Sequence, residues 1–192
     1  MYRRRETQEG FETCSLFAFR YVKLLLYLFI MKWLFVFLFV IGGLTGNAND
    51  STKLYNPYAD VTKEVALALA KAKKEKKQVL LQIGGNWCVN CYRLNSLMKT
   101  DALLKQLVEN NYIVYHLNYS PENKNLSYLK KLGYPQRFGF PVLVVLDGET
   151  EAVIHTQDVG LLEKGNGYDA GKVKMFLKGW SRGAFDEALY KE

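Results

Sequence analysis

A short apolar run, VLLQI at residues 79–83, leads directly into GGNWCVNC, where two cysteines stand three positions apart. A run of this length beside a turn signal is typical of a strand that is covered on both faces. We expect GGN to turn the chain and a helix to extend from the first cysteine to about Lys99. This strand, turn and helix together determine where the sulfur atoms of Cys88 and Cys91 lie.

Helical spacing gives the two cysteines different surroundings. Cys91 shares a stripe with Leu94, Leu97 and Met98 and should face the core, whereas Cys88 lies in the first turn and should be exposed at the rim. Cα atoms three apart on a helical turn fall within the ~4.4–6.8 Å that a disulfide spans. The helix N-terminus stabilises a thiolate at Cys88. The arrangement suits attack by Cys88 on a substrate disulfide and resolution of the mixed disulfide by Cys91.

An apolar leader precedes the rest of the chain. Residues 24–41 are almost wholly apolar apart from Lys32, and basic residues precede them. In one interpretation translation starts at Met31, Lys32 is the charged region of a secretory signal peptide, and the small residues at 46–48 form its cleavage site. In this interpretation residues 1–30 precede the true start of translation and are not part of the protein.

In a second interpretation the leader is kept as a membrane anchor, because about 18 apolar residues are at the lower limit of what spans a bilayer. The basic residues before it would stay in the cytoplasm, which again places the rest of the chain outside. We favour cleavage. Both interpretations predict a periplasmic or secreted protein, anchored to the inner membrane in the second case and otherwise not in contact with the membrane. The chain then divides into a leader (1–48), a polar linker that is either a tether or an irregular arm (49–59), and a domain (60–192).

Export changes the argument from charge. The chain carries 26 Lys and Arg against 19 Asp and Glu, a net charge of +7. The leader holds six of the basic and three of the acidic residues, which leaves 20 against 16 and a net charge of only +4. The densest basic run, at 71–78, falls where a helix should end. Lysines there interact favourably with the negative end of the helix dipole and stay solvated. We therefore predict no nucleic-acid partner.

The cysteine count supports a chemical role for the pair. Cys14 lies in the leader, so the exported domain keeps only Cys88 and Cys91. A disulfide that closes so short a loop constrains the unfolded chain little. A pair kept in an oxidising compartment for so little structural gain indicates chemistry.

Other roles for the pair fit the sequence less well. A structural zinc site needs four ligands, and the only histidines beyond residue 48 are His116 and His155, on different predicted strands. A c-type haem attachment needs a histidine where this chain has Tyr92. We predict no metal and no other cofactor, and we interpret both histidines as ordinary strand residues. A purely structural disulfide stays open as the alternative.

The rest of the domain alternates helices with strands. Asp60 should cap a helix whose apolar positions recur at helical spacing from Val61 to Ala72. Further helices are predicted at 100–111, with Thr100 as the cap, within the segment after Ser120 up to about Gly133, and at 170–189. Strands are predicted at 112–119, 142–146 and 152–156, with a turn at Asp147 and Gly148 between the last two. A glycine-rich loop is predicted at 157–169. This order predicts an α/β fold with a mixed central sheet sandwiched by helices.

With these elements in place, the sequence resembles the thioredoxin superfamily. The resemblance rests on a strand, W-C-x-x-C at a helix start and, 50 residues later, FGFPVLVVLDG, where an aromatic residue and a proline enter a strand. It is closest to exported bacterial thioredoxin-like domains and covers roughly residues 60–182. It implies a thioredoxin-like fold and a redox-active disulfide between Cys88 and Cys91.

The resemblance also implies a substrate-binding surface. It implies that Pro141 is cis, with Phe140 before it, and a cis bond costs little only before proline. The backbone of the residue before that proline holds an extended substrate segment in the family, which is a form of strand addition. Trp87 would shield the cysteine pair and shape the contact surface.

Two features depart from the family, and a third sets the redox chemistry. Many thioredoxins have a buried aspartate where this chain has Gln82, and an amide cannot take the proton of the buried thiol. The predicted loop at 157–169 is longer than is common before the last helix. Between the cysteines, Val89 and Asn90 include neither a proline nor a histidine to stabilise the thiolate further, which favours a reductase or an isomerase over a strong oxidant.

The sequence therefore predicts an exported thiol–disulfide oxidoreductase that reduces or isomerises disulfides of other exported proteins through Cys88 and Cys91. A reductase in an oxidising compartment must be recharged, which implies a membrane-embedded electron donor as a partner. The alternative is a non-enzymatic binding module with a static disulfide, which Gln82 favours.

Overall fold

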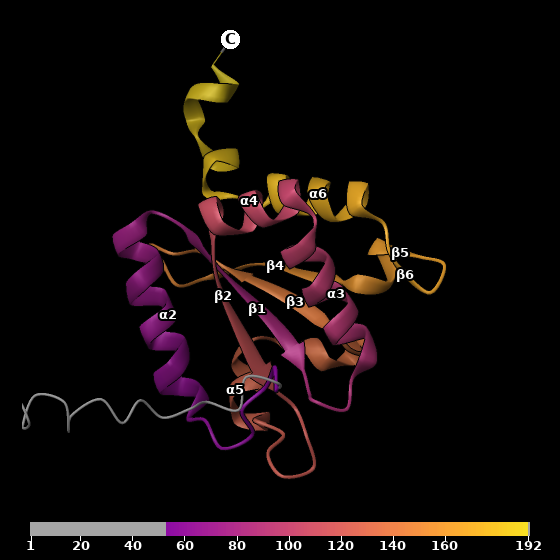
Figure 1. Cartoon of the computed structure of the whole chain (residues 1–192). Coiled ribbons are helices and arrows are strands. Elements are labelled where there is room, and N and C mark those ends of the chain that lie inside the picture. The colour runs from indigo at the N-terminus through magenta and orange to yellow at the C-terminus, as the bar shows by residue number, and fades with distance from the viewer. Residues whose placement is uncertain (1–52, 192) are drawn as a thin grey trace, which may run out of the picture. The chain divides into compact units, whose positions relative to one another are not determined.

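The computed structural model describes residues 53–191 (Figure 1). The predicted leader and the start of the predicted linker lie outside these residues. In the described part of the chain, no helix is long and apolar enough to cross a membrane.

Helices and strands alternate along the domain. The main elements are α2 (Val61–Glu75), β1 (Gln78–Gly84), α3 (Val89–Thr100), α4 (Ala102–Asn111), β2 (Tyr112–Asn118), α5 (Leu126–Lys131), β3 (Val142–Leu146), β4 (Val153–Asp158) and α6 (Ala170–Gly179). Shorter elements are the 3-10 helices η1 (Pro135–Phe138), η2 (Val159–Leu162), η3 (Arg182–Phe185) and η4 (Glu187–Tyr190) and the two-residue strands β5 (Glu163–Lys164) and β6 (Gly167–Tyr168).

The central sheet is mixed, in the order β2-β1-β3-β4. Strand β1 runs parallel to β2 and antiparallel to β3, and β3 runs antiparallel to β4. In this register Gln82 pairs with His116 on β2 and with Leu143 on β3. The predicted mixed sheet is confirmed, and Gln82 lies on its central strand, β1.

Helices flank the sheet (Figure 1), and an apolar core lies on each of its faces. Val79, Leu81 and Ile83 of β1 pack with residues of α2 and α5, whereas Leu80 packs with residues of α3, α4 and α6. Because side chains alternate along a strand, Gln82 points to the same face as Leu80. Gln82 therefore faces α3, the helix that begins at the cysteines.

The helix caps show one prediction confirmed and one wrong. Asp60 caps α2 as predicted, since its side chain accepts from the backbone N–H groups of Thr62 and Lys63. The cap of α4 is Asp101, whose carboxylate accepts from two backbone N–H groups at 3.0 Å. Thr100 was predicted there, but it is the last residue of α3. A residue inside one helix cannot adopt the extended backbone that the cap of the next helix requires.

The C-terminal region differs from the prediction in two places. The predicted loop at 157–169 contains η2 and the small hairpin of β5 and β6, and β4 extends into it as far as Asp158. The predicted helix at 170–189 ends at Gly179, and two 3-10 helices follow. Glycine has a low helix propensity, and two glycines within five residues interrupt the pattern there.

The described part of the predicted linker, residues 53–59, packs against the domain as an irregular N-terminal arm. Backbone N–H and C=O of Tyr55 both bond to the side chain of Asn86, at 2.9 and 2.8 Å. Farther along the arm, Asn123 donates to the carbonyl of Pro57 at 3.1 Å. These contacts hold the arm in place, and Tyr55, which packs with Cys88 and Cys91, is only 1% exposed.

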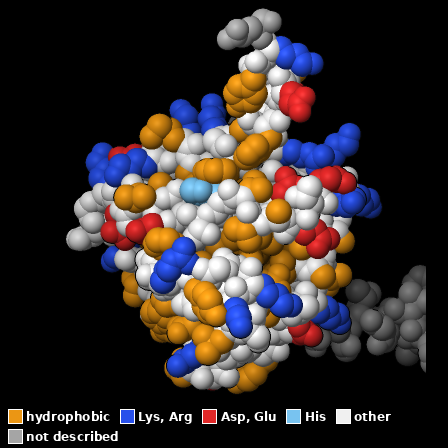
Figure 2. All heavy atoms as spheres, turned by 180° about the vertical axis from the view of Figure 1, so that it is seen from behind, with side chains coloured by type: hydrophobic (Ala, Val, Ile, Leu, Met, Phe, Trp, Pro, Cys, Tyr) orange, Lys and Arg blue, Asp and Glu red, His pale blue; other side chains and the backbone are white. Residues whose placement is uncertain are grey.

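Figure 2 shows one face of the domain, on which Lys and Arg side chains are interspersed with apolar and acidic ones. The basic side chains of this face do not form a continuous patch. The absence of a nucleic-acid partner stays a prediction.

Candidate active site at the cysteine pair

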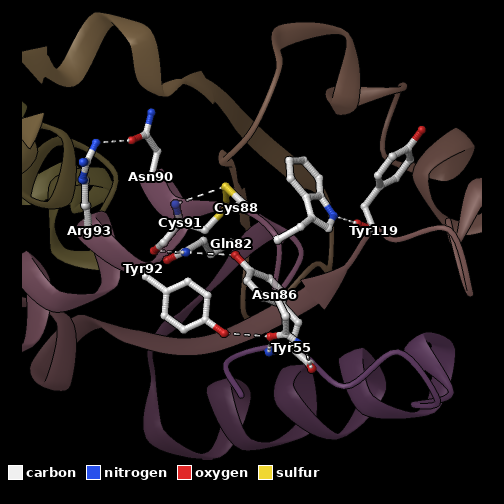
Figure 3. The surroundings of a disulfide bond; sticks show 10 residues. Tyr55, Gln82, Asn86, Cys88, Asn90, Cys91, Tyr92, Arg93 and Tyr119 are labelled. Atoms are coloured by element: carbon white, nitrogen blue, oxygen red, sulfur yellow. Dashed lines mark hydrogen bonds between the residues drawn. A yellow bond between two sulfur atoms is a disulfide. The ribbon is translucent and has the colours of Figure 1, made fainter. Parts of the chain in front are cut away.

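Cys88 and Cys91 form a disulfide with Cα atoms 5.3 Å apart (Figure 3). Cys88 is the N-cap of α3, and Cys91 lies in the first turn of the helix. Cys91 is fully buried with Leu94 and Met98 on the inner face of α3, as the helical spacing predicts.

The sulfur of Cys88 takes the place that a side-chain oxygen has in an ordinary cap. The backbone N–H of Cys91 donates to Sγ of Cys88, with 3.1 Å between nitrogen and sulfur. A hydrogen bond from an N–H group and the positive end of the helix dipole both favour the charged form of a thiol. When the disulfide is reduced, this position stabilises a thiolate at Cys88.

The predicted exposure of Cys88 is wrong, because only 4% of the residue is exposed. As a cap, its side chain turns back toward the helix, where it packs in a small apolar cluster with Tyr55 and Cys91. Leu54 of the arm and Phe140 pack against this cluster. A substrate disulfide therefore reaches the sulfur only through a narrow opening or after a local movement.

Phe140, Pro141 and Trp87 lie at the same site. The Phe140–Pro141 peptide bond is cis, as the resemblance implies. The ring of Phe140 meets that of Trp87 edge to face, with centroids 5.4 Å apart and planes at 87°. Trp87 is 54% exposed and donates from its indole nitrogen to the carbonyl of Tyr119 at 2.9 Å. The residue before the first cysteine thus presents a fixed aromatic surface to the solvent.

A shallow pocket of about 290 Å³ opens beside this aromatic surface. It is lined by Trp87, Tyr119, Ser120, Pro121 and Lys124. Apolar rings with one cation at the edge suit an apolar or aromatic side chain of a peptide.

Gln82 lies directly beneath the pair and is fully buried. Its amide nitrogen donates to the hydroxyl of Tyr55 at 3.0 Å and to the carbonyl of Cys91 at 2.9 Å (Figure 3). Its amide oxygen is buried without a hydrogen-bond partner. The amide therefore positions the turn that carries Cys91, but it cannot exchange a proton with the sulfur at neutral pH.

Tyr55 is the site residue that sequence reasoning missed. It belongs to a polar arm that reads as a linker, and its only local signal is an aromatic residue in that arm. A Cβ atom added to Gly84 would lie 2.4 Å from Sγ of Cys91 and 2.9 Å from the Tyr55 hydroxyl. The sulfur and the hydroxyl therefore flank the same small space beside Gly84. Burial raises the pKa of Tyr55, so its hydroxyl stays protonated.

The two histidines have different surroundings. His116 of β2 packs edge to face on Tyr55, with centroids 5.6 Å apart, and its Nε2 is buried without a hydrogen-bond partner. Burial, with a smaller effect of Lys99, lowers the pKa of His116 to about 4. His155 of β4 stacks on Trp180 with centroids 4.0 Å apart. His116 thus borders the site as a neutral ring, whereas His155 packs in an aromatic cluster that involves α6.

The comparisons with known proteins agree with this geometry. Residues 60–148 match the model of a family described as thioredoxin-like. The domain has a thioredoxin-like fold. This thioredoxin-like domain is similar to the crystal structure of a disulphide isomerase from Xylella fastidiosa Temecula1, with 26% identity and a TM-score of 0.57. The match covers 65% of this chain and 93% of that one.

Two other similar structures share lower identity with the thioredoxin-like domain. A thioredoxin from Thermus thermophilus is 21% identical with a TM-score of 0.43, over 66% of this chain and 88% of that chain. The oxidised C-terminal domain of DsbD from Neisseria meningitidis is 17% identical with a TM-score of 0.43, over 64% and 98%. No curated protein is similar in sequence to this chain.

Proposed function

We propose that this protein is a thiol–disulfide oxidoreductase that reduces or isomerises disulfides of exported proteins. The observation that carries the proposal is the position of Cys88 at the cap of α3, where its sulfur accepts the N–H of Cys91 at 3.1 Å. A thiolate stabilised there attacks a substrate disulfide. The sulfur of Cys91, already within bonding distance, then displaces the substrate.

The residues between the cysteines support a reductase or an isomerase. Val89 has no hydrogen-bonding side chain, and the side chain of Asn90 accepts a hydrogen bond from Arg93 at 3.0 Å. Neither side chain donates to the sulfur of Cys88, so the thiolate gains no further stabilisation of the kind that makes a strong oxidant. The similarity to a disulphide isomerase from Xylella fastidiosa supports the same assignment.

The aromatic surface beside the pair supports protein or peptide substrates. Trp87 and Phe140 form a fixed edge-to-face pair of rings. The cis peptide bond between Phe140 and Pro141 lies directly after this pair along the chain. An extended substrate segment would pair with the backbone of Phe140. One of its side chains would occupy the pocket that Trp87 and Lys124 line.

Export and electron supply complete the proposal. The leader carries the domain to the periplasm or the medium, where substrates with disulfides occur. A reductase there consumes electrons at every turnover, so a membrane-embedded donor would reduce the Cys88–Cys91 disulfide again.

Reduction of insulin by dithiothreitol tests the function. The wild-type chain should accelerate insulin reduction, and Cys88→Ser should abolish the acceleration. A wild-type rate equal to that of dithiothreitol alone would contradict the proposal. A reduction potential between about −180 and −270 mV would identify a reductase or isomerase, and one near about −120 mV an oxidant.

A second function, a binding module with a static disulfide, is favoured by one observation. Cys88 is only 4% exposed, which limits the contact of its sulfur with a large substrate. In that case the aromatic surface of Trp87 would bind a peptide, and binding would persist in Cys88→Ser. Peptide binding together with an unaccelerated insulin reduction would establish the module in place of the enzyme.

A further inference from the structure

Resolution of a mixed disulfide requires Cys91 to lose a proton, and the following inference rests on the function proposed above. In that step the Cys91 sulfur attacks Cys88, the bond between Cys88 and the substrate sulfur breaks, and the Cys88–Cys91 bond forms. The electron pair leaves on the substrate sulfur, which takes up the proton that Cys91 has lost. Something near Cys91 must stabilise its sulfur while the negative charge lies there.

Gln82 and its neighbour on β2, His116, do not take the proton. Gln82 donates to the Cys91 carbonyl at 2.9 Å, but an amide does not titrate at neutral pH. His116 is the partner of Gln82 on β2, and a pKa of about 4 makes it too weak a base at neutral pH. The site therefore lacks an effective base at the place where many thioredoxins have a carboxylate.

The site holds a hydrogen-bond donor instead. The hydroxyl of Tyr55 and the sulfur of Cys91 flank the same space beside Gly84, at 2.9 and 2.4 Å from the position of a Cβ atom there. The hydroxyl oxygen accepts a hydrogen bond from Gln82 at 3.0 Å. In the described part of the chain it donates to no nitrogen or oxygen atom, so its own proton is free for the sulfur.

We propose that the hydroxyl of Tyr55 donates a hydrogen bond to the sulfur of Cys91 while that sulfur carries negative charge. Tyr55 would thereby stabilise the charged sulfur of Cys91, as the backbone N–H of Cys91 stabilises that of Cys88. The arm is part of the site, because the side chain of Asn86 fixes the backbone of Tyr55 on both sides, at 2.9 and 2.8 Å. Gln82 occupies one lone pair of the hydroxyl and so leaves its proton to turn toward the sulfur.

The test measures the pKa of Cys91 itself, which does not depend on the function proposed. In the full chain with Cys88→Ser, the NMR shift of the Cys91 Cβ carbon is followed against pH, with and without Tyr55→Phe. Loss of a hydrogen bond to a charged group should raise the pKa of Cys91 by about one to two units. An unchanged pKa would overturn the proposal.

Tyr92→Phe is the matched control. The Tyr92 hydroxyl also holds the arm, since it accepts from the N–H of Leu54 at 3.3 Å and donates to Asn86 at 3.0 Å. Within the described residues the Tyr92 hydroxyl bonds to Leu54 and Asn86 and not to the sulfur of Cys91, so its loss should leave the pKa of Cys91 unchanged. Equal shifts in Tyr92→Phe and Tyr55→Phe would mean that arm packing, and not the Tyr55 hydroxyl, sets this pKa, which would overturn the proposal.

A kinetic measurement links the hydrogen bond to the reaction. Resolution of a preformed peptide mixed disulfide on Cys88 should slow about threefold to tenfold in Tyr55→Phe, because the greater nucleophilicity of a more basic thiolate offsets part of the loss of thiolate. Attack by Cys88, measured in a Cys91→Ser background, should not change with Tyr55→Phe. Slowing of both steps to the same extent would show a general structural effect and contradict the proposal. Failure of the attack step in the otherwise unaltered Cys91→Ser protein would instead refute the proposed function.

A substitution that keeps the shape of the side chain guards against misfolding of Tyr55→Phe. Replacement of Tyr55 by 3-fluorotyrosine makes the phenol a stronger donor and keeps the ring in place. The pKa of Cys91 should then fall below that of the unmodified chain. A rise or no change would overturn the proposal.

Discussion

The backbone N–H of Cys91 donates a hydrogen bond to the sulfur of Cys88 across 3.1 Å. The residue that would resolve a mixed disulfide thus also stabilises the sulfur that would form it. Because the N–H belongs to the first turn of α3, the stabilisation depends on an intact helix start and not on a further side chain.

Cys88 should react first with iodoacetamide in the reduced protein. Its pKa should lie below the ~8.5 of a free thiol, and it is slightly exposed, at 4%, whereas Cys91 is fully buried. Peptide mass spectrometry after brief labelling gives the two rates separately. Equal labelling, or faster labelling of Cys91, would reverse the roles assigned here.

The strand, turn and helix around the pair could be predicted because their signals are local. An apolar run between turn residues predicts β1, and the cysteine spacing predicts which sulfur faces the core. The cis bond before Pro141 was predicted from the family resemblance, and that resemblance includes the neighbouring residues Phe140 and Pro141. These features need no knowledge of distant contacts.

The surroundings of the pair could not be predicted because distant segments form them. Tyr55 is buried through contacts with distant residues such as Asn86 and Gln82, 31 and 27 positions away, and its polar neighbours predict a linker. The low exposure of Cys88 depends on Phe140, which comes from the segment between η1 and β3, far along the chain. Helical spacing places a residue on a face, but it does not show what covers that face.

Gly84→Ala should destabilise the domain. The added Cβ atom would lie 2.4 Å from the sulfur of Cys91, which the disulfide and the helix hold in place. Such overpacking costs about 1–3 kcal/mol. Denaturant unfolding of Gly84→Ala should therefore show a lower midpoint, whereas Gly179→Ala, which meets no atom within 4 Å, should be neutral or slightly stabilising. Equal stability of Gly84→Ala and the wild type would mean that Gly84 does not approach the sulfur.

Gln82→Asp should speed resolution and cost stability. A carboxyl group beside Cys91 can accept its proton, so single-turnover release of a peptide from Cys88 should be faster near neutral pH. The variant loses the two donors to Tyr55 and Cys91, at a cost of about 1–3 kcal/mol. Burial should raise the pKa of the new carboxyl, so the cost should grow as pH rises from about 4 to that pKa.

Gln78→Asp is the control for this substitution. Gln78 is equally buried at the other end of β1, where its side chain accepts from the N–H of Gly148 at 2.7 Å. The Gln78→Asp variant should be less stable than the wild type but should resolve mixed disulfides no faster. A resolution rate in Gln82→Asp no higher than in Gln78→Asp would show that a carboxyl at position 82 does not serve the sulfur.

His116 should make the protein less stable in mild acid. Its pKa is about 4 in the folded protein and 6.5 in an unperturbed chain, so the unfolded state binds more protons between these values. The stability present above pH 6.5 should fall as pH drops toward 4, by up to about 3 kcal/mol. His116→Phe keeps a flat ring against Tyr55 and should flatten this dependence, measured by denaturant unfolding at several pH values.

His155→Gln is the matched control for the acid dependence. It removes the other histidine of the described residues, which stacks on Trp180. The loss of stability in mild acid that His116 causes should persist in this variant. The same acid dependence in His116→Phe and the wild type would show that His116 is not the group responsible.

Capture of a mixed disulfide addresses the proposed chemistry directly. Cys91→Ser is incubated with a peptide disulfide, and mass spectrometry locates any covalent adduct. The proposed roles predict one peptide bound to Cys88 in Cys91→Ser and no stable adduct in Cys88→Ser, because the remaining sulfur is buried. No adduct in Cys91→Ser, or an equally rapid adduct on Cys91 in Cys88→Ser, would contradict the assignment of Cys88 as the attacking sulfur.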